Sequence, residues 1–263
     1  MNNNKLCNSV SKTMNQLLDE IQRSIKTSVL DNSVGVAFSG GVDSTLVAKL
    51  LHDAGYDIQL LTIGFHDSHD INFAKEVNEF LKFKHNILEI EPESFQETSE
   101  KIHDIIKTDN LSWNENSIAF YYVSKLAKSL GISKVITANG IDELFCGYNS
   151  YREAISISEN EVQKMMDLKL KNEKEMMIAV NNVSSEFGVT IVQPLLTDSF
   201  IDFAKTIPIS KKIHGADDLL RKHVIRELAI ECNVPKISAY KQKKALQYGT
   251  QIHKSLLKSR KTS

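Results

Sequence analysis

The chain has 263 residues, 41% of them hydrophobic, which is enough for one large α/β domain or one such domain with a helical extension. Its 32 basic and 33 acidic side chains nearly cancel, so no strong overall field draws it to nucleic acid or to a membrane. Three widely spaced cysteines without a CxxC pair argue against a disulfide framework and against a structural zinc or iron–sulfur site.

The apolar pattern alternates between short runs and helical spacing along the first half of the chain. An amphipathic helix is predicted over residues 11–29. Short apolar runs then predict strands at 34–38, 58–63, 86–90 and 135–137, and helical spacing predicts helices at 44–54, 72–83, 94–107 and 115–130. Strands separated by helices of this length predict an α/β fold with a parallel sheet and helices on both faces.

After about residue 150 the strand signal disappears. Residues 159–187 are charged, Met-rich and helical, a helix is expected around 198–206, and another over 217–231. We therefore expect an N-terminal helix at 1–30, an α/β core at 31–150, and a helical substrate-side layer at 151–263 that completes the same domain.

The most informative motif follows the first predicted strand. Val34–Phe38 runs directly into Ser39-Gly40-Gly41-Val42-Asp43-Ser44 and then into a helix. Two glycines allow a tight turn and close approach of an anion, and the helix directs free N–H groups and its positive dipole end at that anion. Asp43 would repel phosphate unless a cation lies between them, so it implies Mg²⁺.

A helix capped after a glycine turn would be the simpler interpretation of this segment, since Asp and Ser are common N-caps. The order of strand, six-residue motif and helix favours a phosphate site instead. The spacing of a Walker P-loop, Gly-x-x-x-x-Gly-Lys, is absent.

This turn resembles the pyrophosphate loop of the ATP pyrophosphatases, which adenylate a carbonyl or carboxyl oxygen and release pyrophosphate. Three further stretches are similar to the synthetase domain of asparagine synthetases: Thr137–Tyr148 (TANGIDELFCGY), Lys222–Glu227 (KHVIRE) and Tyr240–Lys243 (YKQK). The resemblance runs from about residue 34 to 250. It implies an adenine nucleotide alpha hydrolase-like fold with ATP and Mg²⁺ as cofactors.

The same resemblance implies roles for individual residues. Asp43 and Asp142 would both hold Mg²⁺, and Lys243 would stabilise negative charge developing during catalysis. Lys243 could instead be a surface lysine in a basic cluster with Lys241 and Lys244. The family's ATP-binding positions are occupied here by Phe38, Ser39, Gly40, Gly41, Asp43, Ser44, Ile63, Thr137 and Ala138.

Two positions depart from the family pattern. Asn139 stands where the family has a carboxylate assigned as general base, and an amide cannot accept that proton at neutral pH. Glu143 is the candidate replacement for this base, unless the nucleophile needs no base. The predicted catalytic residues are then Glu143, Asp142 and Lys243. Cys146 stands where the family has a glycine. It could be a small core residue, or it could carry sulfur as a cysteine does in the sulfur-transferring relatives.

From these residues we expect an ATP-dependent, AMP-forming carbon–nitrogen ligase that adenylates a carboxylate and forms an amide with ammonia or another amine. The chain offers no room for a glutaminase domain, so ammonia would come from solution or from a separate glutaminase subunit. We expect a cytoplasmic protein without nucleic-acid or membrane partners, and a homo-oligomer stays open.

Two alternatives stay open as well: a sulfur-transferring or tRNA-modifying enzyme of the same superfamily, and a nucleotide-binding subunit without catalytic activity. The sequence identifies neither the carboxylate substrate nor the nucleophile.

Overall fold

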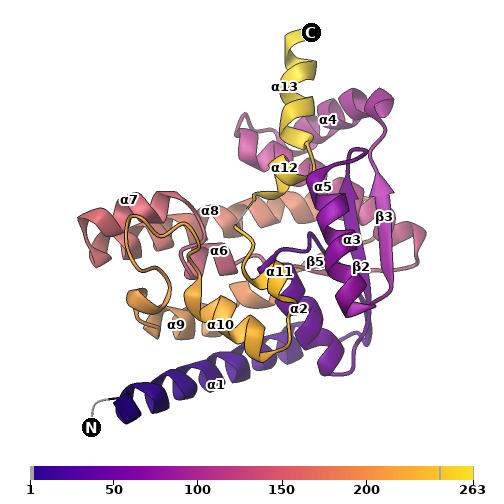
Figure 1. Cartoon of the computed structure of the whole chain (residues 1–263). Coiled ribbons are helices and arrows are strands. Elements are labelled where there is room, and N and C mark those ends of the chain that lie inside the picture. The colour runs from indigo at the N-terminus through magenta and orange to yellow at the C-terminus, as the bar shows by residue number, and fades with distance from the viewer. Residues whose placement is uncertain (1–2, 243, 263) are drawn as a thin grey trace.

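Five parallel strands form the single sheet of this computed structural model, which describes residues 3–242 and 244–262, with side chains for residues 12–242 and 244–258. The strand order is β3-β2-β1-β4-β5 (Figure 1). The strands are β1 (Ser33–Ala37), β2 (Asp57–Gly64), β3 (His85–Glu89), β4 (Lys134–Ile136) and β5 (Thr190–Val192). The predicted parallel α/β sheet covered by helices is confirmed.

The sheet order places two loops side by side. The chain moves outward from β1 to β2 and β3, and then crosses back to add β4 on the other side of β1. Val36 of β1 pairs with Leu60 of β2 and with Ile136 of β4. The loops after β1 and β4 therefore leave the carboxyl edge of the sheet at its topological switch point, where open α/β sheets bind their ligands.

Helices cover both faces of the sheet, and a separate hydrophobic core lies between the sheet and the helices on each face. One core joins the sheet to α5 (Leu111–Ser129), with α4 (Pro92–Ile106), α8 (Glu159–Ser185) and α13 (Ile252–Thr262) packed around it. The other core contains α2 (Val42–Asp53), α3 (His69–Leu81), α10 (His223–Glu231) and α1 (Asn3–Ser28). The remaining helical elements are α6 (Ile141–Leu144), α7 (Ser150–Ile157), η1 (Pro194–Leu196), α9 (Asp198–Thr206), η2 (Ile209–Lys211), α11 (Lys236–Ala239) and α12 (Leu246–Gly249).

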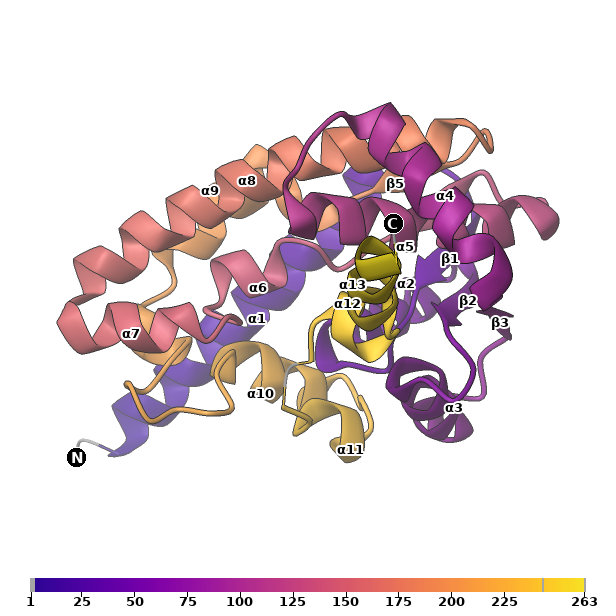
Figure 2. The ribbon, with the colours of Figure 1, turned by 90° about the horizontal axis from the view of Figure 1, so that it is seen from above.

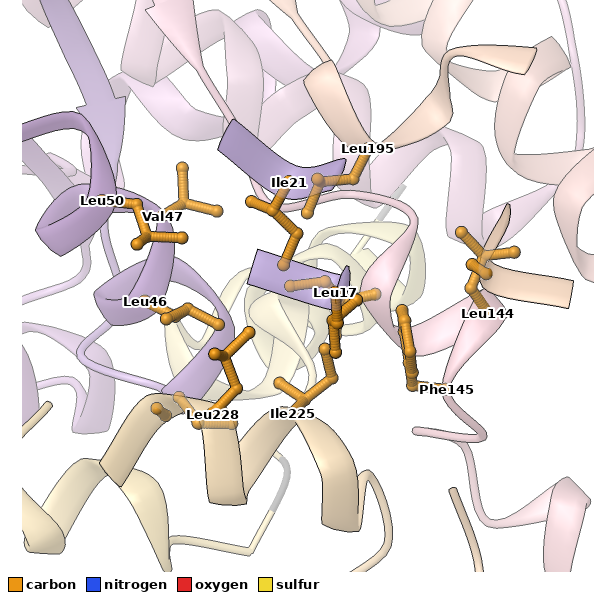
Figure 3. Close-up of a cluster of buried hydrophobic side chains, with 14 of the residues drawn as sticks. Leu17, Ile21, Leu46, Val47, Leu50, Leu144, Phe145, Leu195, Ile225 and Leu228 are labelled. Carbon is orange, nitrogen blue, oxygen red and sulfur yellow. The ribbon is translucent and has the colours of Figure 1, made fainter. Parts of the chain in front are cut away.

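The predicted N-terminal helix α1 lies along the outside of this second core and contacts α9 and α10 (Figures 1 and 2). Its apolar positions Leu17 and Ile21 are fully buried between α2 and α10 (Figure 3). Ser24 of the same helix donates a hydrogen bond to the carbonyl of Pro194, which ties α1 to the segment after β5. Among the described residues, no helix combines the length and apolar content needed to cross a bilayer.

The structure adds one strand that the sequence pattern does not predict. β5 lies within the half of the chain expected to be helical, and it pairs in parallel with β4. A strand of three residues, Thr190–Val192, is too short to produce a recognisable alternation.

The last long helix begins later than expected. The sequence predicts a helix from residue 217, whereas α10 starts at His223. Asp218 accepts hydrogen bonds from the backbone N–H groups of Leu220 and Arg221, which folds residues 218–222 into a turn instead of helix.

We predict that Leu17→Ala lowers the free energy of unfolding by about 2–5 kcal/mol, because it removes buried methyl groups from a close-packed core. The measurement is urea unfolding, read as a shift of the midpoint at unchanged slope. Leu30→Ala is the matched control, since Leu30 is 84% exposed, and it should change stability by less than about 0.5 kcal/mol. Equal effects of the two changes would show that α1 contributes little to the core.

Candidate active site

The loop after β1 has the backbone that an anion site needs. Gly40 has a φ of +75°, and a Cβ there would lie 3.1 Å from the backbone oxygen of Phe73, so both conformation and space require glycine. Gly41 is the N-cap of α2 and makes no side-chain capping bond. The first amides of this 12-residue helix therefore face the cleft without a capping side chain.

Hydroxyl groups hold this loop in place. The Ser39 backbone N–H donates to Ser44 Oγ at 3.3 Å, and Ser44 Oγ donates to the Gly41 carbonyl at 3.2 Å. Ser238, from α11, donates to the Gly40 carbonyl at 2.7 Å and contacts Thr45 Oγ1 at 3.0 Å, with all of these groups buried. The loop is thus preorganised, in part by a side chain from the far end of the sequence.

The loop after β4 is equally constrained. Gly140 has a φ of +105°, and a Cβ there would lie 2.5 Å from the carbonyl oxygen of Leu195. A Cβ on Gly147 would lie 1.8 Å from Asp142 Oδ1. Two glycines therefore allow the short helix α6 to present Asp142 toward the loop after β1.

Asp43 and Asp142 meet at the ammonium group of Lys222. Lys222 Nζ lies 2.5 Å from Asp43 Oδ2 and 3.0 Å from Asp142 Oδ1. The Lys222 side chain is only 2% exposed. Burial alone would lower its pKa, but Asp142 and Asp43 outweigh burial and raise the pKa of Lys222 above its usual value. The lysine is therefore charged, and it balances two carboxylates that would otherwise repel each other.

A turn before α10 brings Lys222 to this position. Arg221 and Lys222 both have positive φ, at +51° and +55°. Burial alone would raise the pKa of Asp218, but hydrogen bonds from the backbones of Arg221 and His214 and from the ring of His223 lower it to about 2. The ionised Asp218 holds the turn, and the turn directs Lys222 inward rather than along the helix.

The predicted adenosine side lies between β1 and β2. Thr62 Oγ1 donates to the Phe38 carbonyl at 2.7 Å and contacts His85 Nε2 at 2.8 Å. Burial, with a smaller contribution from Lys75, lowers the pKa of His85 to about 4, so the ring is neutral at physiological pH. The His85 ring also packs edge-on against Phe38. This network fixes the Phe38 backbone beside the cleft.

A cleft of about 310 Å³ joins these groups at the carboxyl edge of the sheet. Gly40 lies behind the cleft wall, against α3. Lys243 lies outside the described residues, so its predicted catalytic position stays a prediction. The predicted site residues that line the cleft are Phe38, Ser39, Gly41, Asp43, Ser44, Ile63, Thr137, Ala138, Asp142 and Glu143.

The two acidic side chains nearest to Asn139 have different surroundings. Glu143, the predicted replacement base, accepts hydrogen bonds from the Gly140 backbone N–H at 3.0 Å and from the Tyr148 hydroxyl. It thereby caps α6. Glu173, from α8, lines the cleft and is 5% exposed, and its Oε1 accepts a hydrogen bond from Asn139 Nδ2 at 2.6 Å. A carboxylate therefore reaches the side chain of residue 139 from a different element.

Asp70 is a further carboxylate at the opposite end of the cleft. It is 4% exposed, and a Cβ on Gly249 would lie 1.9 Å from its Oδ1. Its Oδ1 contacts His69 Nδ1 at 3.1 Å, whereas no hydrogen bond from the described residues reaches its buried Oδ2. Burial, partly opposed by Lys244, raises the pKa of Asp70 to about 7. Asp70 therefore sits at the edge of protonation at neutral pH.

The chain between α11 and α12 contributes Lys241, Gln242, Lys244 and Ala245 to the lining of the cleft. Lys241 Nζ lies 4.4 Å from the centre of the Phe73 ring, a cation–π contact with α3. Lys241 and Lys244 both line the cleft. Two lysines of the basic cluster predicted from the sequence therefore lie at the cleft.

Cys146 is a core residue. It is fully buried, has a φ of +61°, and is not among the described residues that line the cleft. Burial raises the pKa of its thiol to about 12. Its left-handed backbone explains why glycine suits this position in the similar family stretch. A protonated, buried thiol is a poor nucleophile.

The donor groups fit a divalent metal ion. The Asp43 and Asp142 side chains are 19% and 18% exposed, so both remain accessible from the cleft. Carboxylate oxygens are the ligands Mg²⁺ prefers, and the two carboxylates lie beside the Ser39–Ser44 turn. The sharing of one ammonium by both carboxylates shows that this point of the fold already accommodates positive charge.

Four groups are missed by the sequence motifs or given no role by them: Lys222, Glu173 and Asp70, which line the cleft, and Ser238, which holds the loop behind it. Lys222 belongs to the recognised KHVIRE stretch, but nothing in that stretch indicates a partner 179 residues away. Glu173 lies in a charged helix, and the sequence of that helix does not distinguish a buried acidic residue from the exposed ones. Only its burial and its contact with Asn139 distinguish it.

Comparisons with known proteins agree with these motifs. The family model described as asparagine synthase matches residues 16–179, more than half of the chain. The glutamine-hydrolyzing asparagine synthetase 1 of Arabidopsis thaliana is 29% identical over 242 residues, covering 86% of this chain and 41% of the plant protein. A putative glutamine-hydrolyzing asparagine synthetase 1 of Methanocaldococcus jannaschii is 28% identical over 277 residues, covering 90% of this chain and 50% of that protein. The chain thus spans half or less of the length of these relatives.

We predict that Asp70→Asn makes the protein more stable at high pH but not at low pH. The folded state raises the pKa of Asp70 from 3.8 to about 7, so wild-type stability falls as the pH rises through this interval and stays lower above it. The uncharged amide avoids this loss. The melting temperature should rise by at least about 2 °C at pH 8, with little change at pH 4.

Asp67→Asn is the control, because the Asp67 side chain is 79% exposed and should leave the pH dependence of melting unchanged. If Asp70→Asn melted with the pH dependence of the wild type, Asp70 would be ionised in the fold, and the burial argument would be wrong.

Proposed function

The chain belongs to the asparagine synthase family, and on that premise we propose that it is an ATP-dependent ligase that adenylates a carboxylate substrate, releases pyrophosphate and forms an amide. The observation that supports this most directly is the convergence of Asp43 and Asp142 on Lys222, at the N-terminus of α2. Two carboxylates and one buried cation at the switch point of the sheet suit a site that holds a triphosphate and its metal ion.

The proposed binding of ATP follows from the geometry of the two loops. The α2 amides and the hydroxyls of Ser39 and Ser44 would donate to phosphate oxygens, and Phe38, Ile63, Thr137 and Ala138 would surround the adenosine. Asp43 and Asp142 would hold Mg²⁺, which would neutralise charge on the pyrophosphate leaving group. Lys222 keeps the two carboxylates together in this structure.

We assign proton acceptance during amide formation to Glu173. Asn139 cannot accept a proton, but its amide donates to Glu173 Oε1 at 2.6 Å. The Asn139 side chain would orient the Glu173 carboxylate within the cleft, where it could take a proton from an attacking amine. Glu143 is less suited, because both of its oxygens accept hydrogen bonds from the chain's own groups.

The amine donor and the substrate follow from the family only as proposals. The relatives are named as glutamine-hydrolyzing asparagine synthetases, which makes aspartate the first carboxylate to test and ammonia the first nucleophile. A separate glutaminase subunit as the source of ammonia, a cytoplasmic location and a homo-oligomeric state stay predictions.

The test is a screen for carboxylate-dependent exchange of pyrophosphate into ATP, with ammonium and magnesium supplied for the complete reaction. One carboxylic acid should stimulate exchange. Asp43→Asn should weaken binding of Mg·ATP by about tenfold or more, since it removes a charged ligand. Asp53→Asn, at the other end of the same helix and paired with Lys49, is the control and should bind normally.

Two results would overturn the proposal. ATP binding without exchange for any acid would assign the chain as a nucleotide-binding subunit. Turnover stimulated by tRNA and lost in Cys146→Ala would assign it to sulfur transfer.

The assignment of Glu173 makes a separate prediction. Glu173→Gln should slow amide formation from ammonium by about 10²–10⁴-fold, the usual contribution of a general base, and leave pyrophosphate exchange nearly unchanged. Hydroxylamine, which is mostly unprotonated at neutral pH, should restore much of the rate. Glu175→Gln is the matched control, because Glu175 lies exposed on the same helix. An equal loss of exchange and amide formation would instead indicate a structural role for Glu173.

A further inference from the structure

A second group of ligand-type side chains lies in the turn before α10, outside the cleft. In the described part of the chain, His214, Asp218 and His223 form the one group of three or more such residues whose ligand atoms all lie within 4.8 Å of one another. His223 Nε2 lies 2.6 Å from Asp218 Oδ2. The rings of His214 and His223 are stacked, with centroids 3.5 Å apart and planes at 5°.

We propose that these three side chains form a binding site for a transition-metal ion of the zinc class, separate from the magnesium site. Two imidazoles and one carboxylate are a common protein donor set for Zn²⁺, and three protein ligands leave a fourth position for water. Imidazole nitrogen suits zinc, copper, iron and nickel, whereas Mg²⁺ prefers oxygen donors only. Two imidazoles and one carboxylate therefore disfavour Mg²⁺, the ion expected at Asp43 and Asp142.

The backbone that carries the three ligands is already ordered. Asp218 Oδ2 accepts from the His214 backbone N–H at 3.0 Å, and Asp218 Oδ1 accepts from those of Leu220 and Arg221 at 3.0 and 2.9 Å. Arg152 Nε donates to the Ala216 carbonyl at 2.6 Å and fixes the tip of the turn. These bonds also orient the ligating carboxylate, as hydrogen bonds around metal ligands commonly do.

Binding requires only local movement. Ligands of one tetrahedral zinc ion lie about 3.3 Å apart, and the three ligand atoms here already lie within 4.8 Å of one another. The ion would replace the hydrogen bond between His223 Nε2 and Asp218, and the bridging proton would move to Nδ1 or to solvent. The His214 ring would turn out of the stack, which its exposed position permits. Arg221 interacts electrostatically with Asp218, and Arg152 bonds the Ala216 carbonyl of the same segment, so both cations would weaken the site and we expect reversible binding.

The position of this site gives it a structural consequence. His223 directly follows Lys222, and Asp218 holds the turn that points Lys222 at Asp43 and Asp142. An ion bound to both histidines would clamp the two ends of that turn. The ion would therefore stabilise the segment that supplies the buried ammonium to the cleft.

The test is titration of the untagged full chain with Zn²⁺, followed by calorimetry, and with Co²⁺, followed by its visible ligand-field bands. We expect saturable binding of one ion that excess Mg²⁺ does not displace, and a higher melting temperature with Zn²⁺. His214→Ala should weaken Zn²⁺ binding by at least about tenfold, because even the loss of a group that only orients a ligand costs about 10–100-fold.

His52→Ala is the matched control, since His52 is also an exposed histidine beside an aspartate and lies outside the cluster. It should bind Zn²⁺ like the wild type. Circular dichroism would verify that both variants fold. Absence of saturable binding, equal binding by His214→Ala and the wild type, or thiolate charge-transfer bands from a cysteine ligand would each overturn the proposal.

Discussion

The contact on which the cleft depends is the buried ion triad of Lys222, Asp43 and Asp142. Asp43 lies in the first turn of α2, Asp142 in α6 and Lys222 just before α10, and the lysine lies 179 and 80 residues away from its two partners. Because the Lys222 ammonium is only 2% exposed, loss of a carboxylate would leave a buried charge with fewer partners, which is more costly than loss of a surface pair. The triad therefore ties the sheet edge to the C-terminal half of the chain, and the site exists only when both halves are folded together.

The same constraint explains where the chain uses unusual backbone. Gly40 and Gly140 have positive φ, and Gly147 leaves space that Asp142 fills. Arg221 and Lys222 adopt left-handed conformations without being glycine, and Asp218 compensates through hydrogen bonds to that turn. Non-glycine residues persist in such conformations only when their surroundings determine them strongly. Left-handed residues elsewhere, such as Lys82 and Lys107, end helices, whereas these four lie in the segments that carry Asp43, Asp142 and Lys222.

The sequence predicted the parts of this molecule that are encoded locally. Strands β1 to β4 and the Ser39–Ser44 turn have apolar runs, glycines and helix starts within a few residues of one another, and they were predicted with small errors at the ends. β5 was missed because three residues carry no period, and the start of α10 was misplaced because the capping effect of Asp218 depends on its side-chain orientation. Glu173 and Ser238 could not be found at all, since each acts on a segment that only the tertiary fold brings near. Local sequence patterns therefore predict the helices and strands, whereas the contacts that build the cleft depend on residues that are distant in the sequence.

Asn139 illustrates this limit most clearly, because the sequence alone suggests that a catalytic carboxylate has been lost. In the fold, the amide donates to a carboxylate that α8 carries across the cleft, so an acid and residue 139 still form one unit. α8 also contributes Lys169, Asn172 and Met176 to the cleft wall. A base mounted on this wall would move with the surface that contacts the substrate rather than with the loop that holds the nucleotide. Under the proposed function, this geometry would couple proton acceptance to substrate binding at α8, and would leave the loops after β1 and β4 to hold phosphate and metal.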